Sequence, residues 1–374
     1  MPWYKETVMS QRRKFIGLIE SSIKVSDACR RFGISRRTGY KWLDRFEAQG
    51  EGGLEDRSRC PLGSPNKTPD ELEQVILRAR KAHPAWGGRK LKRWLQNRGV
   101  EELPSPSTIT EILRRHGRID PAESRKREPY HRFEYPHPND LWQMDFKGPF
   151  EVETQACHPL TVLDDHSRFA IALQACEGQT RPLVKRHLET AFEAYGLPKA
   201  MLVDNGPPWS ATTQGEWTKL SVWLLRLGVE VFHSRIRHPQ TLGKDERFHK
   251  TLLLECLTGR PFSTFDQVQP RFDRWRDVYN FERPHESLAM NPPASRYKAS
   301  SRPYPLKLPP IEYTAQDRVR IVNDTGRIAL DGRDWRVGKA FSGYPVGVRP
   351  GSEDGRLQVI FCGRVIKEID LRPL

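Results

Sequence analysis

The sequence predicts a multidomain protein with small helical modules, a central α/β core built on a mixed sheet, and a small β domain. Three observations predict this class. Residues 10–48 and 70–117 carry apolar side chains at helical spacing. Residues 136–300 alternate short apolar segments with amphipathic stretches, which is typical of an α/β core. After residue 310, short β segments are separated by turns that contain Asp and Gly.

The composition favours a polyanionic partner. The chain of 374 residues holds 62 Lys and Arg against 47 Asp and Glu, a net charge of +15, and its first 130 residues hold 28 basic and 17 acidic residues. No apolar run is long enough to span a membrane, and the N-terminus lacks the apolar segment of a signal peptide. Six scattered cysteines form no C-x-x-C pair, so we expect reduced thiols in a cytoplasmic protein without a structural zinc site.

Residues 1–56 predict a helix-turn-helix DNA-binding domain. Gly33 permits a tight turn, and Ser35 can cap the helix that follows it. We expect that helix to bury three residues, Tyr40, Leu43 and Phe46. Because the second helix of this motif enters the major groove with its N-terminus first, we expect DNA contacts from four exposed side chains near its start, Arg36, Arg37, Thr38 and Lys41. The alternative is a small helical bundle with a solvated basic face.

Two polar segments flank a second helical domain. Residues 57–69, rich in Pro, Gly and Ser, predict a basic linker in which Arg57 and Arg59 contact phosphates or are simply solvated. Residues 70–117 predict three amphipathic helices that form a weaker helix-turn-helix, since a Ser-Pro-Ser-Thr stretch can cap the last helix. Residues 118–135 are polar and basic and predict another linker.

The core, residues 136–300, is expected to contain five strands, with helices after the third, fourth and fifth. The pattern LWQMDFKGPFEV places Asp145 within the first strand, on the face opposite Trp142. The fourth strand, in KAMLVDNG, ends at Asp204, and the last helix follows HPQT and carries Glu246 near its start. Because ligand sites collect at the carboxyl ends of neighbouring strands, we expect these three carboxylates to meet at one edge of the sheet.

Such a cluster predicts a site for hard divalent cations. Converging acids repel one another unless cations bind, and carboxylate oxygens suit such ions. Two ions roughly 3.5–4 Å apart can activate a nucleophile and stabilise the leaving oxygen of a phosphoryl transfer. Asp145 could instead be solvated, Asp204 could form a turn, and Glu246 could pair with Lys250. The acids at 164–165 compete as ligands, although DDHSR also suits a hairpin turn.

Five segments, in order along the chain, resemble bacterial insertion-sequence transposases of the retroviral-integrase superfamily: WQMDFKG, LDDHSRF, VDNGPPW, HPQTLGKDERFHKTL and YNFERPHESLAMNPPASRY. The resemblance covers nearly the whole chain, including both helical domains. It implies a ribonuclease-H-like catalytic core with an Asp-Asp-Glu triad at Asp145, Asp204 and Glu246. By the same resemblance the triad would hold two Mg²⁺ ions, for which Mn²⁺ could substitute.

Two positions depart from the family's pattern. Leu242 stands where the HPQTQGK motif has glutamine, and Leu253 stands where relatives often carry Lys or Arg seven residues past the catalytic glutamate. We therefore expect Lys244 or Lys250 to take over contact with the transposon end. Together with Arg247, these lysines would position the phosphate backbone.

The last part of the chain predicts a Pro-rich linker, residues 301–310, and a small β-barrel, residues 311–374. The β domain resembles the C-terminal barrel of the same transposases. It would contact DNA or take part in assembly, or else only stabilise the core or the oligomer.

Taken together, these features predict a Mg-dependent DNA transposase of the bacterial cytoplasm, associated with the nucleoid. The helical domains would bind the terminal inverted repeats, and the core would cleave the ends and join the 3′-hydroxyl to target DNA. Because two DNA ends must be held together, a homo-oligomer of at least two chains is expected. The alternatives are a transposase-derived regulator that binds DNA without cutting it, and a structure-specific nuclease.

Overall fold

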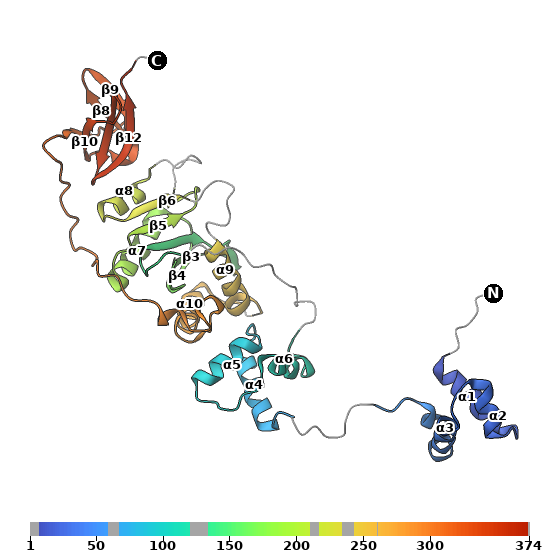
Figure 1. Cartoon of the computed structure of the whole chain (residues 1–374). Coiled ribbons are helices and arrows are strands. Elements are labelled where there is room, and N and C mark those ends of the chain that lie inside the picture. The colour runs from blue at the N-terminus through green and yellow to red at the C-terminus, as the bar shows by residue number, and fades with distance from the viewer. Residues whose placement is uncertain are drawn as a thin grey trace. The chain divides into compact units, whose positions relative to one another are not determined.

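Apolar side chains at helical spacing build the first part of the chain from three helices (Figure 1). The computed structural model describes residues 7–58, 67–119, 134–209, 217–233, 243–259 and 261–372. It divides into two compact units, residues 1–67 and 68–374.

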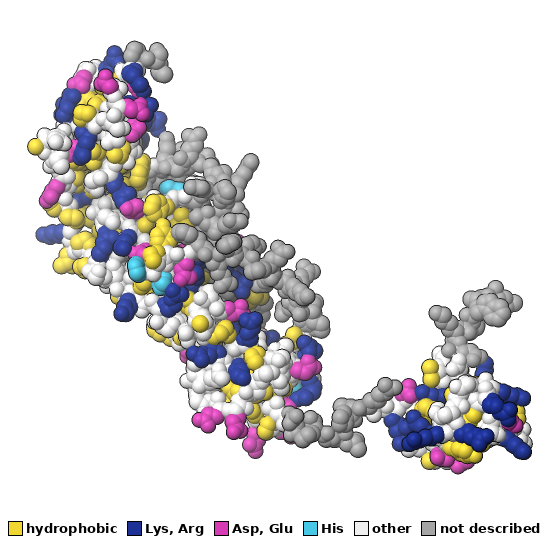
Figure 2. All heavy atoms as spheres, in the orientation of Figure 1, with side chains coloured by type: hydrophobic (Ala, Val, Ile, Leu, Met, Phe, Trp, Pro, Cys, Tyr) yellow, Lys and Arg dark blue, Asp and Glu magenta, His cyan; other side chains and the backbone are white. Residues whose placement is uncertain are grey.

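The first unit consists of α1 (Val8–Glu20), α2 (Val25–Phe32), α3 (Arg36–Gln49) and the 3₁₀ turn η1 (Gly50–Leu54). Its core is formed by Phe15, Ile16, Ala28, Cys29, Trp42 and Leu54. Figure 2 shows Lys and Arg side chains gathered over the surface of this unit.

The turn between α2 and α3 confirms the expected helix-turn-helix geometry. Gly33 has a φ of 63°, in the left-handed region that favours glycine. Ser35 Oγ accepts a hydrogen bond from the Thr38 N–H at 3.1 Å and so caps α3. The prediction that Tyr40 is buried is wrong, because this side chain is 52% exposed. Gly39 and Trp42 face the core instead. Because each residue advances a helix by about 100°, Tyr40, which follows Gly39, is turned away from the core.

The second unit begins with α4 (Asp70–Ala82), α5 (Gly88–Asn97) and α6 (Pro106–Arg115). These helices enclose their own core of Ile76, Ala79, Trp86, Leu91, Leu95, Ile109, Ile112 and Leu113. Glu73 of α4 is buried, and its carboxylate pairs with Arg115 and His116 of the same three-helix unit. We call α4, α5 and α6 the second helical group.

The α/β core is built on a mixed sheet, as the sequence predicts. Its strands are β1 (Leu141–Phe146), β2 (Phe150–Val152), β3 (Gln155–Asp164), β4 (Ala170–Cys176), β5 (Ala200–Val203) and β6 (Glu230–His233). The order is β2-β3-β1-β5-β6, and β4 pairs with β3. β1 is antiparallel to β3 and parallel to β5, which is parallel to β6.

Helices cover both faces of this sheet (Figure 1). On one face, α7 (Arg181–Tyr195) and α8 (Lys219–Arg226) share an apolar core with Trp142 and Met144 of β1. On the other face, α9 (Gly243–Leu252) and α10 (Val268–Asp277) pack on Leu163 and Leu173. The π turns η4 (Leu253–Leu257) and η6 (Val278–Glu282) continue these two helices.

The C-terminal part confirms the expected short β strands, which pair antiparallel, but it does not form a closed barrel. β7 (Arg318–Ile321), β10 (Pro345–Pro350), β11 (Arg356–Phe361) and β12 (Arg364–Asp370) form one sheet in the order β12-β11-β10-β7. β8 (Arg327–Leu330) and β9 (Arg333–Arg336) form a separate hairpin. Within residues 311–372 no pairing joins β7 to β12. The hairpin instead packs Ile328 and Leu330 into the core of the sheet.

Across the described helices, none combines the length and apolarity that a membrane crossing needs.

We predict that Gly39 is required for the packing of the first unit. A Cβ on Gly39 would overlap the Cys29 sulfur and lie 3.0 Å from the Phe15 ring. Gly39→Ala should therefore lower the free energy of unfolding of residues 1–67 by about 1–3 kcal/mol, the usual cost of overpacking. Urea denaturation of the isolated unit measures this change.

Gly17→Ala is the matched control, because a Cβ at that position in the last turn of α1 would meet no atom within 4 Å outside the helix's own backbone. It should be neutral or raise the free energy of unfolding by up to about 1 kcal/mol, since Ala is the better helix former. Equal effects of the two substitutions would contradict the packing argument.

Candidate active site

The pairing of β1 with β5 aligns two of the predicted carboxylates. Gln143 of β1 lies opposite Leu202 of β5 in a parallel ladder. Asp145 lies two residues beyond Gln143, and Asp204 lies two residues beyond Leu202, directly after the end of β5. The two acids therefore lie side by side on the same face. Neighbouring strands are about 4.8 Å apart, which brings the two carboxyl groups into each other's electrostatic field.

The environment of this pair disfavours two negative charges. Burial raises the pKa of Asp145 to about 6, and the charge of Asp204 adds to this effect, although a hydrogen bond from the Phe146 N–H opposes it. Burial also raises the pKa of Asp204, whose Oδ1 accepts the Gly206 N–H at 3.0 Å. The backbone oxygen of Asp204 lies 3.0 Å from His233 Nδ1 on β6, which holds the end of β5 in place. A bound cation would relieve this electrostatic cost.

The Asp145 side chain projects toward α9. Trp142 and Met144 project into the α7–α8 face, so Asp145 occupies the opposite face, on which α9 packs. Its cross-strand neighbour Thr161 donates a hydrogen bond to the Asp145 backbone oxygen at 3.0 Å and lies 2.8 Å from His249 Nε2 of α9. α9 is thereby fixed beside the aspartate pair.

Glu246 is placed on α9 but is not brought into contact with the two aspartates. It is exposed, and it lies three residues before His249, on the same side of the helix. Among the residues that the structure describes, no three acidic, His or Cys side chains lie close enough together to hold a metal ion. Residues 234–242, which precede α9 and include Leu242, lie outside the described part of the chain.

Asp245, the acid next to Glu246, is not among the site residues that the sequence predicts. Asp245 is fully buried, and neither of its carboxyl oxygens has a hydrogen-bond partner in the described residues. Its pKa is raised well above the usual range, first by burial and then by the charges of Asp145 and Asp165. The signal was available, because Asp245 shares the helical stripe of the core residues Phe248 and Leu252.

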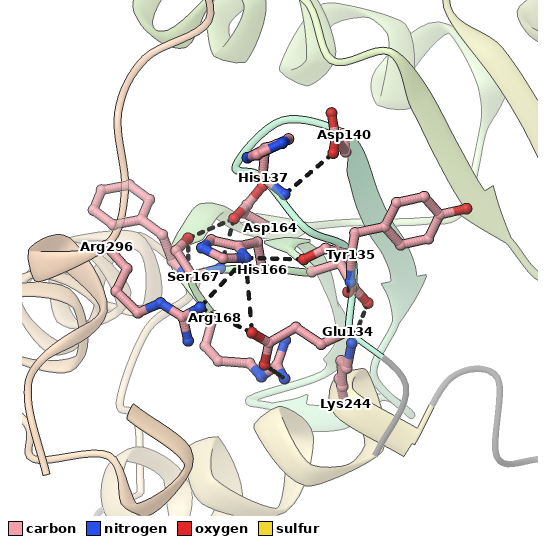
Figure 3. A network of polar contacts seen from close by, with 12 residues as sticks. Glu134, Tyr135, His137, Asp140, Asp164, His166, Ser167, Arg168, Lys244 and Arg296 are labelled. Carbon is pink, nitrogen blue, oxygen red and sulfur yellow. Dashed lines mark hydrogen bonds and ion pairs between the residues drawn. The ribbon is translucent and has the colours of Figure 1, made fainter. Parts of the chain in front are cut away.

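Asp164 and Asp165, the competing ligands in the sequence, belong to a structural network at the other end of β1 (Figure 3). Asp164 accepts hydrogen bonds from the Asn139 N–H at 2.7 Å and from the Ser167 N–H and hydroxyl. Asp165 accepts hydrogen bonds from the Tyr135 N–H, from the Gln143 amide, and from the Lys244 ammonium. Their oxygens are thus occupied by protein donors.

The predicted DNA-binding residues of α3 lie at the surface of the first unit. Arg36, Arg37 and Lys41 are exposed, and Thr38 is half-buried at the capped start of the helix. The Lys41 ammonium lies 4.8 Å from the centre of the Trp42 ring.

The other predicted DNA-binding residues are in different situations. The Arg57 guanidinium donates a hydrogen bond to Gln49 at 3.2 Å, and Arg59 lies outside the described residues. On α9, Arg247 and Lys250 are exposed, whereas Lys244 is mostly buried in its ion pair with Asp165.

Comparisons with protein families match each part of this architecture. Residues 11–61 match the family described as "Helix-turn-helix domain", and residues 38–113 match "Homeodomain-like domain". Residues 136–239 and 227–293 match two families that are both described as "Integrase core domain". Residues 317–373 match "IS481 family transposase, C-terminal domain".

Proteins of insertion elements are among the relatives. The "Insertion element IS476 uncharacterized 39.2 kDa protein" of Xanthomonas euvesicatoria is 31% identical over 157 residues, which cover 42% of this chain and 44% of the relative. The "Insertion element IS407 uncharacterized 31.7 kDa protein" of Burkholderia multivorans is 27% identical over 167 residues, which cover 44% of this chain and 58% of the relative. The chain thus spans about half the length of these curated relatives.

Among solved structures, a chain of the simian T-cell lymphotropic virus intasome in complex with PP2A regulatory subunit B56 gamma is 16% identical. The match has a TM-score of 0.37 and covers 70% of this chain and 90% of that chain.

An integrase core, a C-terminal domain of IS481-type transposases and relatives from insertion elements therefore agree with the motifs in the sequence. The chain therefore carries an integrase core domain and a C-terminal domain of the IS481 transposase family, and it is similar to proteins of bacterial insertion elements.

Proposed function

We propose that this protein binds the terminal inverted repeats of an insertion sequence, cleaves the element's ends by metal-dependent hydrolysis, and joins the 3′-hydroxyl to target DNA. The observation that carries the proposal is the register of β1 and β5, which sets Asp145 beside Asp204 along the face where α9 packs. Helix-turn-helix modules supply DNA binding in the same chain.

Asp145, Asp204 and Glu246 are the residues that we assign to the metal ions. Two neighbouring carboxylates whose pKa values are raised by burial form a donor set that suits a hard divalent cation. Glu246 lies on the same side of α9 as His249, and His249 contacts Thr161 of β3, the cross-strand neighbour of Asp145. When bound, two Mg²⁺ ions, or Mn²⁺ in their place, would lower the pKa of the attacking hydroxyl and neutralise charge on the phosphate.

The chain's own residues hold and orient the reacting DNA. Asp145 must be ionised in order to bind a cation, and the carboxylate of Asp204 is oriented by a hydrogen bond from the Gly206 N–H. Because Lys244 is held by Asp165, we assign the phosphate contacts on α9 to the exposed Arg247 and Lys250. Cleavage and joining of paired ends require a homo-oligomer of at least two chains, acting on DNA in the bacterial cytoplasm.

The first test compares four acidic residues in a joining assay with element-end DNA and Mg²⁺. Asp145→Asn, Asp204→Asn and Glu246→Gln should each lower joining by several orders of magnitude, because each removes a proposed metal ligand, while DNA binding persists. The matched control is Glu177→Gln, since Glu177 is an exposed acid of the same core, just after β4, and should retain joining.

Asp245→Asn decides between the two adjacent acids of α9. If Asp245→Asn abolishes joining and Glu246→Gln does not, the third ligand is Asp245 and the assignment of Glu246 is wrong. DNA binding without any cleavage by the unaltered protein would favour a regulator, and cleavage without joining would favour a nuclease.

The second test uses the raised pKa of Asp145 and measures stability rather than activity. The folded chain binds the Asp145 proton more tightly than the unfolded chain, because the pKa is about 6 instead of 3.8. The stability that this proton confers is present at low pH and is lost as pH rises through about 6. At pH 7.5 without divalent ions, Asp145→Asn should therefore have a higher Tm than the unaltered protein.

Added Mg²⁺ should raise the Tm of the unaltered protein at pH 7.5 and leave that of Asp145→Asn nearly unchanged, because ligand binding stabilises only a fold that has the site. Scanning calorimetry with and without Mg²⁺ measures both effects. An equal rise in Tm for both proteins would show that Mg²⁺ binds elsewhere.

The third test separates base reading from phosphate contact on α3. A bidentate arginine–guanine contact discriminates between bases by about 1–3 kcal/mol. Arg37→Ala should relax the preference at one or two base pairs, whereas Lys41→Ala should weaken binding to all sequences alike. A binding selection over randomised end sequences measures both. An unchanged preferred site with Arg37→Ala would mean that α3 holds only the backbone.

A further inference from the structure

A cleft lies where the second helical group meets the core. Its volume is about 400 Å³. It is bounded by the start of α5, the start of α6 and the 3₁₀ turn η7 (Glu286–Leu288), and its lining includes Gly88, Arg89, Lys90, Ser107, Thr110 and Glu286. None of these residues takes part in the site described above.

Contacts between α5 and the core hold this cleft in shape. The Arg98 guanidinium pairs with Glu282 of η6 at 2.8 Å, and the Trp94 Nε1–H donates to the same carboxylate at 3.3 Å. Arg93, the residue before Trp94, donates to the Asn291 side chain at 2.9 Å. The helix is thus attached to the core of the same chain along its length.

The walls formed by α5 and α6 are also in direct contact. A Cβ on Gly88 would overlap the backbone oxygen of Pro106 and lie 2.7 Å from Thr110 Oγ1. Glycine therefore allows the first turns of the two helices to touch. The Thr110 hydroxyl donates a hydrogen bond to the Pro106 backbone oxygen at 2.8 Å. The charged groups that α5 contributes to the lining are Arg89 and Lys90.

Lys90 has no ion pair or hydrogen bond with any of the described residues. Burial lowers the pKa of its ammonium to about 8, and the nearby charges of Arg283 and Arg247 act in the same direction. The acids in reach, Glu255 and Glu286, oppose this shift only in part.

Both of those acids already have other partners. Glu255 pairs with Arg283 at 2.9 Å, and Glu286 lies 3.7 Å from Arg89. Lys90 is therefore a partly buried cation that lies among further cations and has no anionic partner of its own in the part of the chain that the structure describes. Burial of an unpaired charge is costly, and an anionic ligand in the cleft would offset that cost.

We propose that this cleft binds a phosphodiester group of duplex DNA, with Lys90 as the direct contact and Arg89 beside it. The proposal rests on the proposed function, since that function supplies the DNA. Because α5 is attached to the core, a phosphate held here would fix the duplex relative to the core of the same chain. The second helical group would then orient the DNA end as well as bind it.

The test measures how the affinity of the full-length protein for a random-sequence duplex depends on salt concentration. Fluorescence anisotropy of the labelled duplex gives the binding constant. Each phosphate contact contributes about 0.9 to the slope of log K against log salt. Lys90→Gln should lower the magnitude of this slope by about one unit, and Lys90→Arg, which keeps the charge, should restore it. The matched control is Lys81→Gln, an exposed lysine of α4 in the same helical group, which should keep the original slope.

Thermal denaturation of each variant shows whether Lys90 only stabilises the junction. A lower Tm for Lys90→Gln together with an unchanged slope would overturn the proposal, because the residue would then have a structural role. If the unaltered protein binds DNA and Lys90→Gln has the same slope, only the present inference fails. If the unaltered protein does not bind DNA at all, the proposed function fails with it.

Discussion

The parallel register between β1 and β5 is the constraint on which the proposed chemistry depends. A shift of one residue would place Asp204 on the opposite face from Asp145 and separate the two carboxylates by the thickness of the sheet. The apolar pattern prevents such a shift, because Trp142 and Met144 share their core with Met201 and Val203. The acids lie on the opposite face of the same strands, where burial raises the pKa of both.

A network of ion pairs and hydrogen bonds holds the rest of the frame (Figure 3). Glu134, which precedes the core, accepts hydrogen bonds from Arg168 of the β3–β4 turn and from Arg296 near the end of the core, each at 2.9 Å. Lys244 joins α9 to Asp165 in the same region. Loss of one partner would leave a buried charge without compensation, which is more damaging than absence of the whole pair. The network therefore links parts of the chain that are distant in sequence to the start of β1.

Local patterns predicted much of this fold, and long-range packing decided the rest. The Gly33 turn, the Ser35 cap and the placement of Asp145 opposite Trp142 follow from rules that act over a few residues. Two other features depend on what a side chain meets across the structure: the exposure of Tyr40 and the ion pair of Lys244. Likewise, turn spacing predicted the C-terminal strands, but the sequence pattern did not reveal that β8 and β9 form a separate hairpin.

The two faces of α3 have different evolutionary freedom. Gly39 and Trp42 are fixed by the core of the first unit, whereas Arg36, Arg37, Tyr40 and Lys41 make up the outer face. Substitutions at exposed positions away from special features usually change stability by no more than about 0.5 kcal/mol. Related chains could therefore diverge at these outer positions while the helix keeps its place. If these outer residues recognise the element's ends, as proposed, the end sequences and the residues that recognise them could change together without a loss of stability.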